Sequence, residues 1–467
     1  MKQKLLALGP GYAISPNFKG KNKENIIQEI CDRIAEAAIA VRWNRYFSTT
    51  SSAATLHQHL KTVSPFDKKF TKPPPTDDVD LENRLIKFRD EVRQVVNNTT
   101  VKSNLTREQR ELLFELKANR ELHFSIADKT SEFVVMTSDM QRTATKLHFD
   151  DPAYKAVKMP NGEKKTTQFI KKLTESLETK INEKWKEICT KRNLGKKVYD
   201  LFAAYHTVLP TGRIQIKTHK HDAADISSIL LERLKVRPIV SNCNSPMDKI
   251  TFLLCHILTP LLDQVPSHLK NTYTALTKLQ AVPQDELRGK QFFTADVESL
   301  YTNINVNTAI LNIIEFATEH RSKLTLYGLT LTDIHELFEV SLLNSYFMYD
   351  RQVYIQLQGF FMGVRPAPLG AIIKMWKLES LSLYTDLRIS MVYYGRFYDD
   401  LSSAAHNKRR AQLMCNLIEA EDPDQLIHLT LDYPPTKDDY TPFLNMERFS
   451  TNFYSCKGLA TSNMVRI

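Results

Sequence analysis

The sequence predicts an α+β fold, with helices in the first part of the chain and a mixture of strands and helices in the rest. Apolar residues recur at helical spacing through about the first 120 residues. From about residue 205, short runs of β-branched and aromatic residues alternate with segments of helical period. At 467 residues the chain is too long for one ordinary core, which indicates several packed units.

The first part of the chain carries clear signals for the beginnings of helices. Predicted helices lie at 24–45, after a cap at Asp77 or Asp78, and after a capping box formed by Thr106 and Gln109. Between the first two, residues 63–78 contain a run of three prolines. Because proline cannot continue a helix, this stretch is predicted to be an extended connector.

Strand patterns begin after these helices. A polar turn between two β-branched and aromatic runs predicts a hairpin at 124–136, and a long charged helix follows at about 167–192. The other predicted strands are 213–220, 237–241, 290–301, 351–357 and 391–404. The other predicted helices lie near 246–264, 307–318, 332–343, 368–385 and 407–420.

Composition limits the class of protein. With 42% apolar and 25% charged residues the chain is expected to fold, and a net charge of +10 favours an extended polyanion as partner. The six cysteines form no CxxC pair and no zinc-finger cluster, so reduced structural thiols are expected. The N-terminus does not have the pattern of a signal peptide, and the apolar stretch 250–262 is too short to span a bilayer. We therefore expect an intracellular protein.

Acidic residues stand at the end of two apolar strands. Asp296 follows the run FFTA, while Asp399 and Asp400 interrupt an aromatic run. A carboxylate buried beside such a strand is costly unless a cation compensates it, and Mg²⁺ prefers oxygen ligands. Two such ions about 3.5–4 Å apart can activate a primer 3′-hydroxyl and stabilise a pyrophosphate leaving group. Taken singly, the aspartate pair is more typical of a hairpin turn than of a metal site, and Asp296 is more typical of a helix cap.

Cations and glycines accompany these carboxylates. Arg237, in KVRPIVS, and Lys217, in IQIKTHK, lie on predicted strands and can hold a triphosphate, although ordinary surface charge also explains them. Gly359 and Gly363 precede a predicted helix in QGFFMGVRPAPLG. Glycine there allows the backbone to approach a nucleotide closely, although a plain connection between a loop and a helix has the same pattern.

In this order, the segments RPIVS, DVESLYTNI, QGFFMGVRPAPL and GRFYDD resemble the core of reverse transcriptases, most closely the Penelope-like retroelement branch. LLALGPGYAISP, the segment ending in ADK, and IQIKTHK resemble N-terminal segments of the same branch. The resemblance extends from about residue 5 to residue 455. The chain departs from the family pattern at Asp128–Glu132, where glycines are replaced, at Val364–Arg365, and at Asn445, where aspartate is usual.

The resemblance implies roles for individual residues in metal binding. Asp296 and Asp399 would be the principal ligands of two Mg²⁺ ions, for which Mn²⁺ can substitute. Asp400 would be the second aspartate of the pair, and the carbonyl oxygen of Val297 a further ligand.

The resemblance also implies a nucleotide site. Tyr301 would be the steric gate whose ring leaves no room for a 2′-hydroxyl, which selects deoxynucleotides. Arg237, together with Lys217, would contact the triphosphate. Gln358 and Gly359 would line the nucleotide pocket.

The resemblance implies a right-hand polymerase fold, with a helical N-terminal extension at 1–123, fingers at 124–286 and a palm at 287–467. The thumb would be short or absent, and an endonuclease would be missing. The implied activity is RNA-directed addition of deoxynucleotides to a DNA primer on an RNA template, in the nucleus by family analogy. Two alternatives remain: a catalytically inactive, retroelement-derived RNA-binding protein, and an RNA-templated RNA polymerase, which Tyr301 disfavours.

Overall fold

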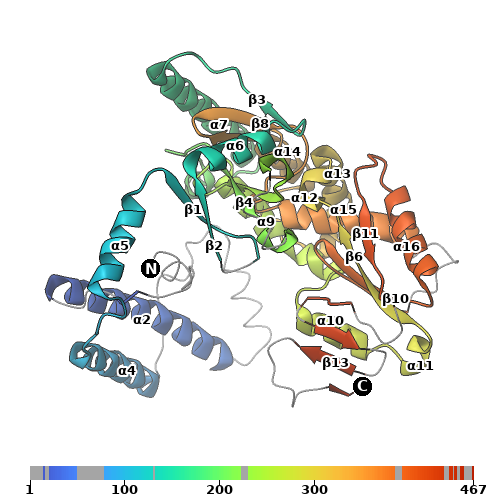
Figure 1. Ribbon diagram of the computed structural model, residues 1–467, viewed down its shortest axis with the longest axis horizontal. Coiled ribbons are helices and arrows are strands. Elements are labelled where there is room, and N and C mark those ends of the chain that lie inside the picture. Colours follow the sequence, from blue (N-terminus) through green and yellow to red (C-terminus); the bar gives the residue numbers. More distant parts are fainter. Residues whose placement is uncertain are drawn as a thin grey trace. The chain divides into compact units, whose positions relative to one another are not determined.

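The computed structural model describes residues 14–15, 20–49, 78–129, 132–221, 230–383, 392–435, 441–444, 446–449, 453–456 and 465–466. The chain forms two compact units (Figure 1). Unit 1 consists of Met1–Lys146 and Ile214–Arg237, and unit 2 of Leu147–Arg213 and Pro238–Ile467. The extension (1–123), fingers (124–286) and palm (287–467) predicted from the sequence have other bounds than these two units. These three segments remain predictions.

Unit 1 contains the helices predicted for the first part of the chain. Helix α2 (Gly20–Thr49) was predicted from its apolar spacing, and α4 (Val79–Asn98) and α5 (Arg107–Ala118) from their caps. Asp78 caps α4, since its side chain accepts a hydrogen bond from the Leu81 N–H at 3.0 Å. Thr106 and Gln109 form the predicted reciprocal capping box of α5. The proline-rich connector falls outside the described residues.

The predicted hairpin is also present in unit 1. Strands β1 (Leu122–Ile126) and β2 (Phe133–Thr137) pair antiparallel, with Leu122 opposite Thr137. Two short 3-10 helices, η1 (Thr218–Lys220) and η2 (Leu231–Arg233), belong to the same unit. Helix α6 (Ser138–Phe149) and strands β4 (Thr211–Ile216) and β5 (Val236–Ser241) cross the boundary between the units.

Unit 2 carries most of the secondary structure. Its helices are α7 (Glu163–Lys191), α8 (Lys196–Phe202), α9 (Asp248–Leu258), η3 (Thr259–Gln264), α10 (Thr272–Gln280), α11 (Gln284–Leu287), α12 (Leu300–Asn303), α13 (Val306–Glu319), η4 (Arg321–Lys323), α14 (Leu331–Leu342), α15 (Ala367–Ser382) and α16 (Lys408–Ala420). Its strands are β3 (Tyr154–Ala156), β6 (Gln291–Val297), β7 (Tyr346–Tyr349), β8 (Gln352–Gln356), β9 (Tyr394–Phe397), β10 (Asp400–Ala405), β11 (Leu429–Asp432), β12 (Met446–Phe449), β13 (Phe453–Cys456) and β14 (Val465–Arg466).

The described residues form three further sheets besides the hairpin. A five-stranded sheet has the order β3-β8-β7-β4-β5, a four-stranded sheet the order β11-β6-β10-β9, and a three-stranded sheet the order β12-β13-β14. All strand pairs of the four-stranded sheet are antiparallel. This sheet carries the candidate carboxylates.

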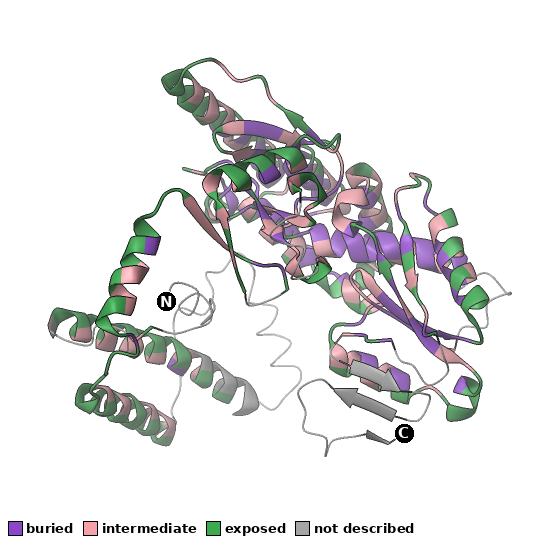
Figure 2. Ribbon diagram, viewed as in Figure 1, coloured by how far each residue is buried: buried purple, intermediate pink, exposed green. Residues whose placement is uncertain are grey.

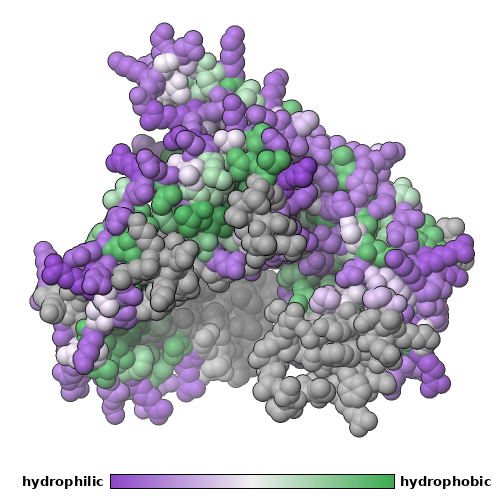
Figure 3. All heavy atoms as spheres, viewed as in Figure 1, coloured by the Kyte–Doolittle hydropathy of each residue, from purple (hydrophilic) through white to green (hydrophobic). Residues whose placement is uncertain are grey.

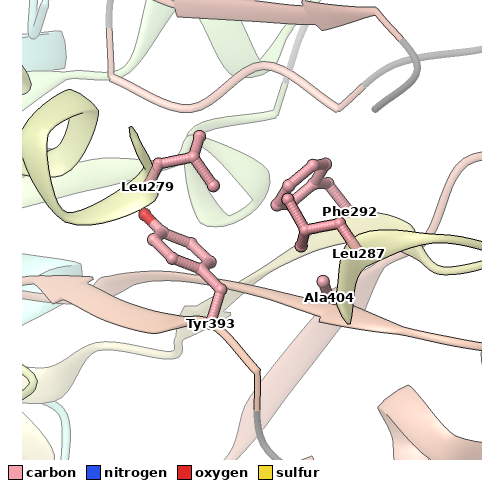
Figure 4. Packing of buried hydrophobic residues seen from close by; sticks show 5 residues of the cluster. All are labelled: Leu279, Leu287, Phe292, Tyr393 and Ala404. Atoms are coloured by element: carbon pink, nitrogen blue, oxygen red, sulfur yellow. The ribbon is translucent and has the colours of Figure 1, made fainter. Parts of the chain in front are cut away.

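The two faces of β6 differ in burial because side chains alternate along a strand. Phe293, Ala295 and Val297 are buried, whereas Asp296 on the other face is exposed. At the far end of that other face, Phe292 packs into an apolar cluster with Leu279, Leu287, Tyr393 and Ala404 (Figure 4). Helices α10 and α11 supply two members of this cluster and so cover this end of the face, whereas Asp296 at the other end is exposed.

Helix α15 is the most deeply buried helix of the core, and Figure 2 shows it buried along most of its length. Neighbouring helices α12, α13 and α16 pack against it. Two charged residues, Lys374 and Glu379, are nevertheless enclosed on this helix, with exposed fractions of 2% and 0%. Each has a charged partner, as described below.

The structure corrects three of the predicted strands. The segment 391–404 is a hairpin of two strands, β9 and β10, and the segment 290–301 ends as a strand at Val297. Ser299 has a left-handed conformation with φ 48°, which ends the strand and starts α12. The segment 213–220 likewise ends as a strand at Ile216 and continues as the 3-10 helix η1. The elements that were not predicted include α6, α8, α10, α11, α12, β3, β7 and β11.

The surface of unit 2 is rich in charge. Hydrophilic side chains gather over α16, where Lys408, Arg409 and Arg410 are exposed (Figure 3). Among the described residues, no helix combines the length and apolarity needed to cross a membrane.

Candidate functional site

Asp296 and Asp400 lie directly opposite each other in the antiparallel pair of β6 and β10. Residues directly opposite in such a pair project from the same face, with Cβ atoms about 4.5–5.5 Å apart. The predicted carboxylates from two segments a hundred residues apart therefore meet at one end of the sheet. On the other side of β6, Thr430 of β11 is the partner of Asp296.

Asp399 lies in the turn that joins β9 and β10. The Asp399 carbonyl oxygen accepts a hydrogen bond from the Val297 N–H at 2.9 Å. Since the N–H and C=O of one strand residue point to the same side, the Val297 carbonyl also faces the turn. The turn depends on Tyr398, whose left-handed φ of 53° is uncommon for a residue with a large side chain. All four residues predicted to hold metal ions thus lie together in unit 2.

The exposure of the three aspartates bears on why a cation is expected beside them. Asp296 is exposed, and Asp399 and Asp400 are half-buried. The cost of burial, on which the sequence argument relied, is therefore small for Asp296. Repulsion between neighbouring carboxylates is the stronger reason, because like charges directly opposite in a sheet destabilise it.

The donor set fits a magnesium ion that is completed by substrate. Among the described residues, no group of three or more His, Cys, Asp or Glu side chains is arranged to hold a metal ion. Mg²⁺ in phosphoryl-transfer sites is usually held by one or two carboxylates together with substrate phosphates and water. Asp296 and Asp400 supply such a pair of carboxylates, with Asp399 adjacent.

Tyr301 and Gly359 are also brought together. The Phe360 N–H donates to the Tyr301 carbonyl at 2.7 Å. Gly359 has φ +79°, and a Cβ at this position would lie 2.4 Å from the Thr302 Cα and 2.6 Å from the Tyr301 carbonyl oxygen. Only glycine fits here, so the loop before α15 and helix α12 are held in close backbone contact.

The neighbouring loop residues are fixed in a similar way. The carbonyl of Gln358 accepts from the Gln356 side chain at 2.8 Å. At Gly363, with φ +136°, a Cβ would lie 2.3 Å from the Val240 carbonyl oxygen. The two glycines predicted to allow close approach thus approach other parts of the protein backbone, which supports the interpretation of the loop as a tightly packed connection.

Arg237 and Lys217 belong to unit 1. The Arg237 Nε lies 3.0 Å from the Asp128 Oδ1, within ion-pair distance but without hydrogen-bond geometry. Asp128 is buried, and its Oδ2 has no hydrogen-bond partner among the described residues. Burial lowers the pKa of Lys217, and the positive charge of Arg237 lowers it further. Asp128, at the point where the chain departs from the family's glycines, was not predicted as the partner of Arg237.

No family model matches this chain, and a search of curated proteins found no match. Among solved structures, the apo telomerase of Candida tropicalis is 10% identical with a TM-score of 0.47, over 92% of this chain and 78% of that chain. The telomerase of Candida albicans with a TWJ fragment of telomeric RNA is 11% identical with a TM-score of 0.44, over 78% of this chain, which spans 57% of that one. The BmCPV RNA-dependent RNA polymerase at its elongation state is 11% identical with a TM-score of 0.35, over 47% of this chain and 20% of that chain.

Proposed function

We propose that this chain is an RNA-directed DNA polymerase that transfers deoxynucleotides onto a primer 3′-hydroxyl. The observation that carries the proposal is the pairing of Asp296 with Asp400 across β6 and β10, with Asp399 in the adjacent turn. The order of the reverse-transcriptase-like segments supports it, as does the net charge of +10. We also propose a right-hand arrangement of fingers and palm, membership of the Penelope-like branch and a nuclear location.

The reaction forms a bond between the primer 3′-oxygen and the α-phosphorus of a deoxynucleoside triphosphate, and the bond to pyrophosphate breaks. Asp296, Asp399 and Asp400, with the Val297 carbonyl, would hold two Mg²⁺ ions or Mn²⁺ in their place. When bound, such ions activate the 3′-hydroxyl and neutralise the charge that develops on the leaving group. The protein contributes mainly the position of these carboxylates.

The predicted nucleotide-site residues would select and hold the deoxynucleotide. Tyr301, held beside Gly359, would exclude a 2′-hydroxyl, and Gln358 would line the same pocket. Arg237 and Lys217 would contact the triphosphate. Arg237 is half-buried beside Asp128, and both residues lie in unit 1.

The test is primer extension on an RNA template with Mg²⁺ and deoxynucleotides, comparing wild type with Asp399→Asn. Asparagine keeps the shape of the side chain and removes its charge, so the turn is retained. Extension by wild type and not by the variant supports the proposal. Asp432→Asn is a matched control, because Asp432 lies on the same sheet opposite Thr294 rather than opposite a carboxylate.

Other outcomes favour the alternatives. Efficient use of ribonucleotides by wild type favours an RNA-templated RNA polymerase. Absence of extension, together with RNA binding that Asp399→Asn leaves unchanged, favours an RNA-binding protein that has lost catalysis. In the polymerase, Tyr301→Ala should relax the preference for deoxynucleotides.

A further inference from the structure

A fully buried ion pair lies beneath the sheet that carries the candidate carboxylates. Arg396 of β9 and Glu379 of α15 both have exposed fractions of 0%, and the Arg396 Nε donates to the Glu379 Oε1. Taking two charges out of water costs several kcal/mol per ion, and the pair is tolerable only where further hydrogen bonds satisfy both groups. Unlike an apolar pair of equal volume, this buried ion pair can hold neighbouring backbone and side-chain groups by hydrogen bonds.

The hydrogen bonds of the pair are extensive. Glu379 accepts from the Tyr394 hydroxyl at 2.8 Å and from the Ser267 hydroxyl at 2.5 Å. The backbone of Arg396 is held as well, because its N–H donates to the Ser267 carbonyl at 2.7 Å and its carbonyl accepts from the Leu269 N–H at 2.8 Å. Helix α15, strand β9 and the segment 267–269 are thus fixed to one another at Arg396.

One branch of the guanidinium extends toward the candidate site. The Arg396 Nη1 donates to the Tyr398 carbonyl at 2.8 Å, and the Nη2 donates to the Ile372 carbonyl at 3.0 Å. The Tyr398 carbonyl belongs to the peptide group that leads directly into Asp399. Tyr398 also has the left-handed φ of 53°, a conformation that costs of order 1–3 kcal/mol and persists only when its surroundings hold it.

Arg396 does not reach the carboxylates themselves. In the pair of β9 and β10 it is opposite Leu401, whereas Asp400 is opposite Phe397. Since neighbouring residues of a strand project from opposite faces, Arg396 lies on the buried face and the Asp296–Asp400 pair on the other. Any influence of Arg396 on the candidate site is therefore transmitted through the backbone of Tyr398 and Asp399.

We infer that Arg396, held in place by Glu379, is a positioning residue that fixes the Tyr398–Asp399 peptide and so sets the geometry in which the aspartates bind metal. This inference rests on the proposed function. Groups that orient metal ligands typically affect metal affinity or activity by about 10–100-fold when they are removed. The same range is expected for Arg396.

The test measures Mn²⁺ binding to the full chain by electron paramagnetic resonance, without nucleic acid, in wild type, Asp399→Asn and Arg396→Lys. Lysine keeps the charge beside Glu379 but cannot also reach the Tyr398 and Ile372 carbonyls. We expect the dissociation constant for Mn²⁺ to rise about 10–100-fold in Arg396→Lys. In primer extension, kcat should fall and the Mg²⁺ requirement should rise, with the KM for primer–template unchanged.

A second buried ion pair on the same helix supplies the control. Lys374 and Asp422 are 2.7 Å apart and buried, and in the described residues neither is bonded to the Tyr398–Asp399 turn. The double variant Lys374→Met/Asp422→Asn should lose stability but keep wild-type Mn²⁺ affinity. If Arg396→Lys fails to fold, the double variant Arg396→Met/Glu379→Gln is measured in its place. This double variant removes both buried charges.

The outcomes separate the two proposals. Weaker Mn²⁺ binding in a folded Arg396 variant, but not in the control, supports the positioning role. Wild-type affinity in that variant, where Asp399→Asn abolishes binding, overturns the positioning role and leaves the proposed function standing. Failure of wild type to bind Mn²⁺ through Asp399 when a deoxynucleoside triphosphate is also present overturns both.

Discussion

Asp296 and Asp400 face each other across two neighbouring strands, with Thr430 on the far side of Asp296. Two carboxylates in this register repel each other, because like charges directly opposite in a sheet are destabilising. A cation bound between them would offset this repulsion.

We expect Asp296→Asn to raise the free energy of unfolding by about 0.2–1 kcal/mol in the presence of EDTA, because it removes the repulsion. Asp400→Asn should have a similar effect, and the double variant should gain less than the sum, since either change relieves the same repulsion. Urea unfolding measures all three, with Asp432→Asn as the control on the same sheet. Destabilisation by both single variants, equal to that of the control, would contradict this expectation.

Addition of Mg²⁺ should reverse the order of stability. A ligand that binds only the folded state stabilises it by mass action, and wild type alone would keep both carboxylates. We therefore expect a rise in melting temperature with Mg²⁺ for wild type and a smaller rise for Asp296→Asn. Equal rises in the two proteins would show that the Mg²⁺ effect does not come from this pair.

Substitution of Gly359 by alanine can be compared with the same substitution at Gly289. Gly359 and Gly289 have nearly the same φ, +79° and +74°, but only at Gly359 would a Cβ meet backbone atoms. Gly289→Ala should therefore cost only the conformational penalty, of order 1–3 kcal/mol, and leave nucleotide use unchanged. Gly359→Ala should cost more and should raise the KM for deoxynucleotides, because Tyr301 must move. Equal losses of stability in both variants would exclude the contact between Gly359 and helix α12.

Local signals predicted much of the fold. Asp78 and the pair of Thr106 and Gln109 fixed the starts of two helices correctly, because capping depends on residues only three positions apart. The single strand over 391–404 was wrong, because the chain turns at Tyr398–Asp399. The alternative interpretation of the aspartate pair as a hairpin turn is confirmed for Asp399, since aspartate is common in turns.

Long-range pairings limited the prediction of the site. The spacing of Asp296 and Asp399 could suggest a shared site only through the family resemblance, since the register of β6 against β10 is a property of the whole sheet. Asp128 and Glu379 were missed because nothing in their local sequence indicates that each lies buried beside an arginine. An arginine within the apolar segment GRFYDD was the signal that could have indicated a buried partner for Arg396.

The Lys374–Asp422 pair allows a separate test of the core. Asp422 also accepts from the Leu426 and Ile427 N–H groups at 2.9 and 3.1 Å. Lys374→Met leaves a buried carboxylate without its cation and should cost about 3–5 kcal/mol. Lys374→Met/Asp422→Asn should cost less than the sum of the single changes, and a double-mutant cycle by urea unfolding measures the coupling. Additive losses would show that the two side chains do not interact.

The same pair predicts a dependence on pH. Burial alone raises the pKa of Asp422, but the hydrogen bond from Lys374 and those from the backbone outweigh it, and the net pKa is lowered. A lowered carboxyl pKa gives stability that is present above the unfolded value, near 4, and is lost as pH falls through the folded value. The difference in stability between wild type and Lys374→Met should therefore be largest above about pH 4 and shrink in more acidic solution.

His268 should make the protein sensitive to mildly acidic pH. Burial, followed by the positive charges of Arg396 and Lys270, lowers the pKa of His268 to about 4, against a smaller opposing effect of Asp263. The folded state thus keeps this ring neutral between about pH 4 and 6.5, whereas the unfolded state takes up a proton there. The contribution of His268 is complete above about pH 6.5 and is lost as pH falls toward 4.

His268→Phe tests this assignment, because phenylalanine keeps a ring against Tyr398, 6.3 Å away between ring centroids, and cannot be protonated. Urea unfolding at several pH values between 4 and 7.5 should show a shallower fall in the free energy of unfolding for the variant than for wild type. His335→Phe is a suitable control, since His335 is a half-buried histidine on α14 that faces Glu339 at 3.7 Å. Identical pH profiles for His268→Phe and wild type would mean that the ring is protonated as readily in the folded state as in the unfolded chain.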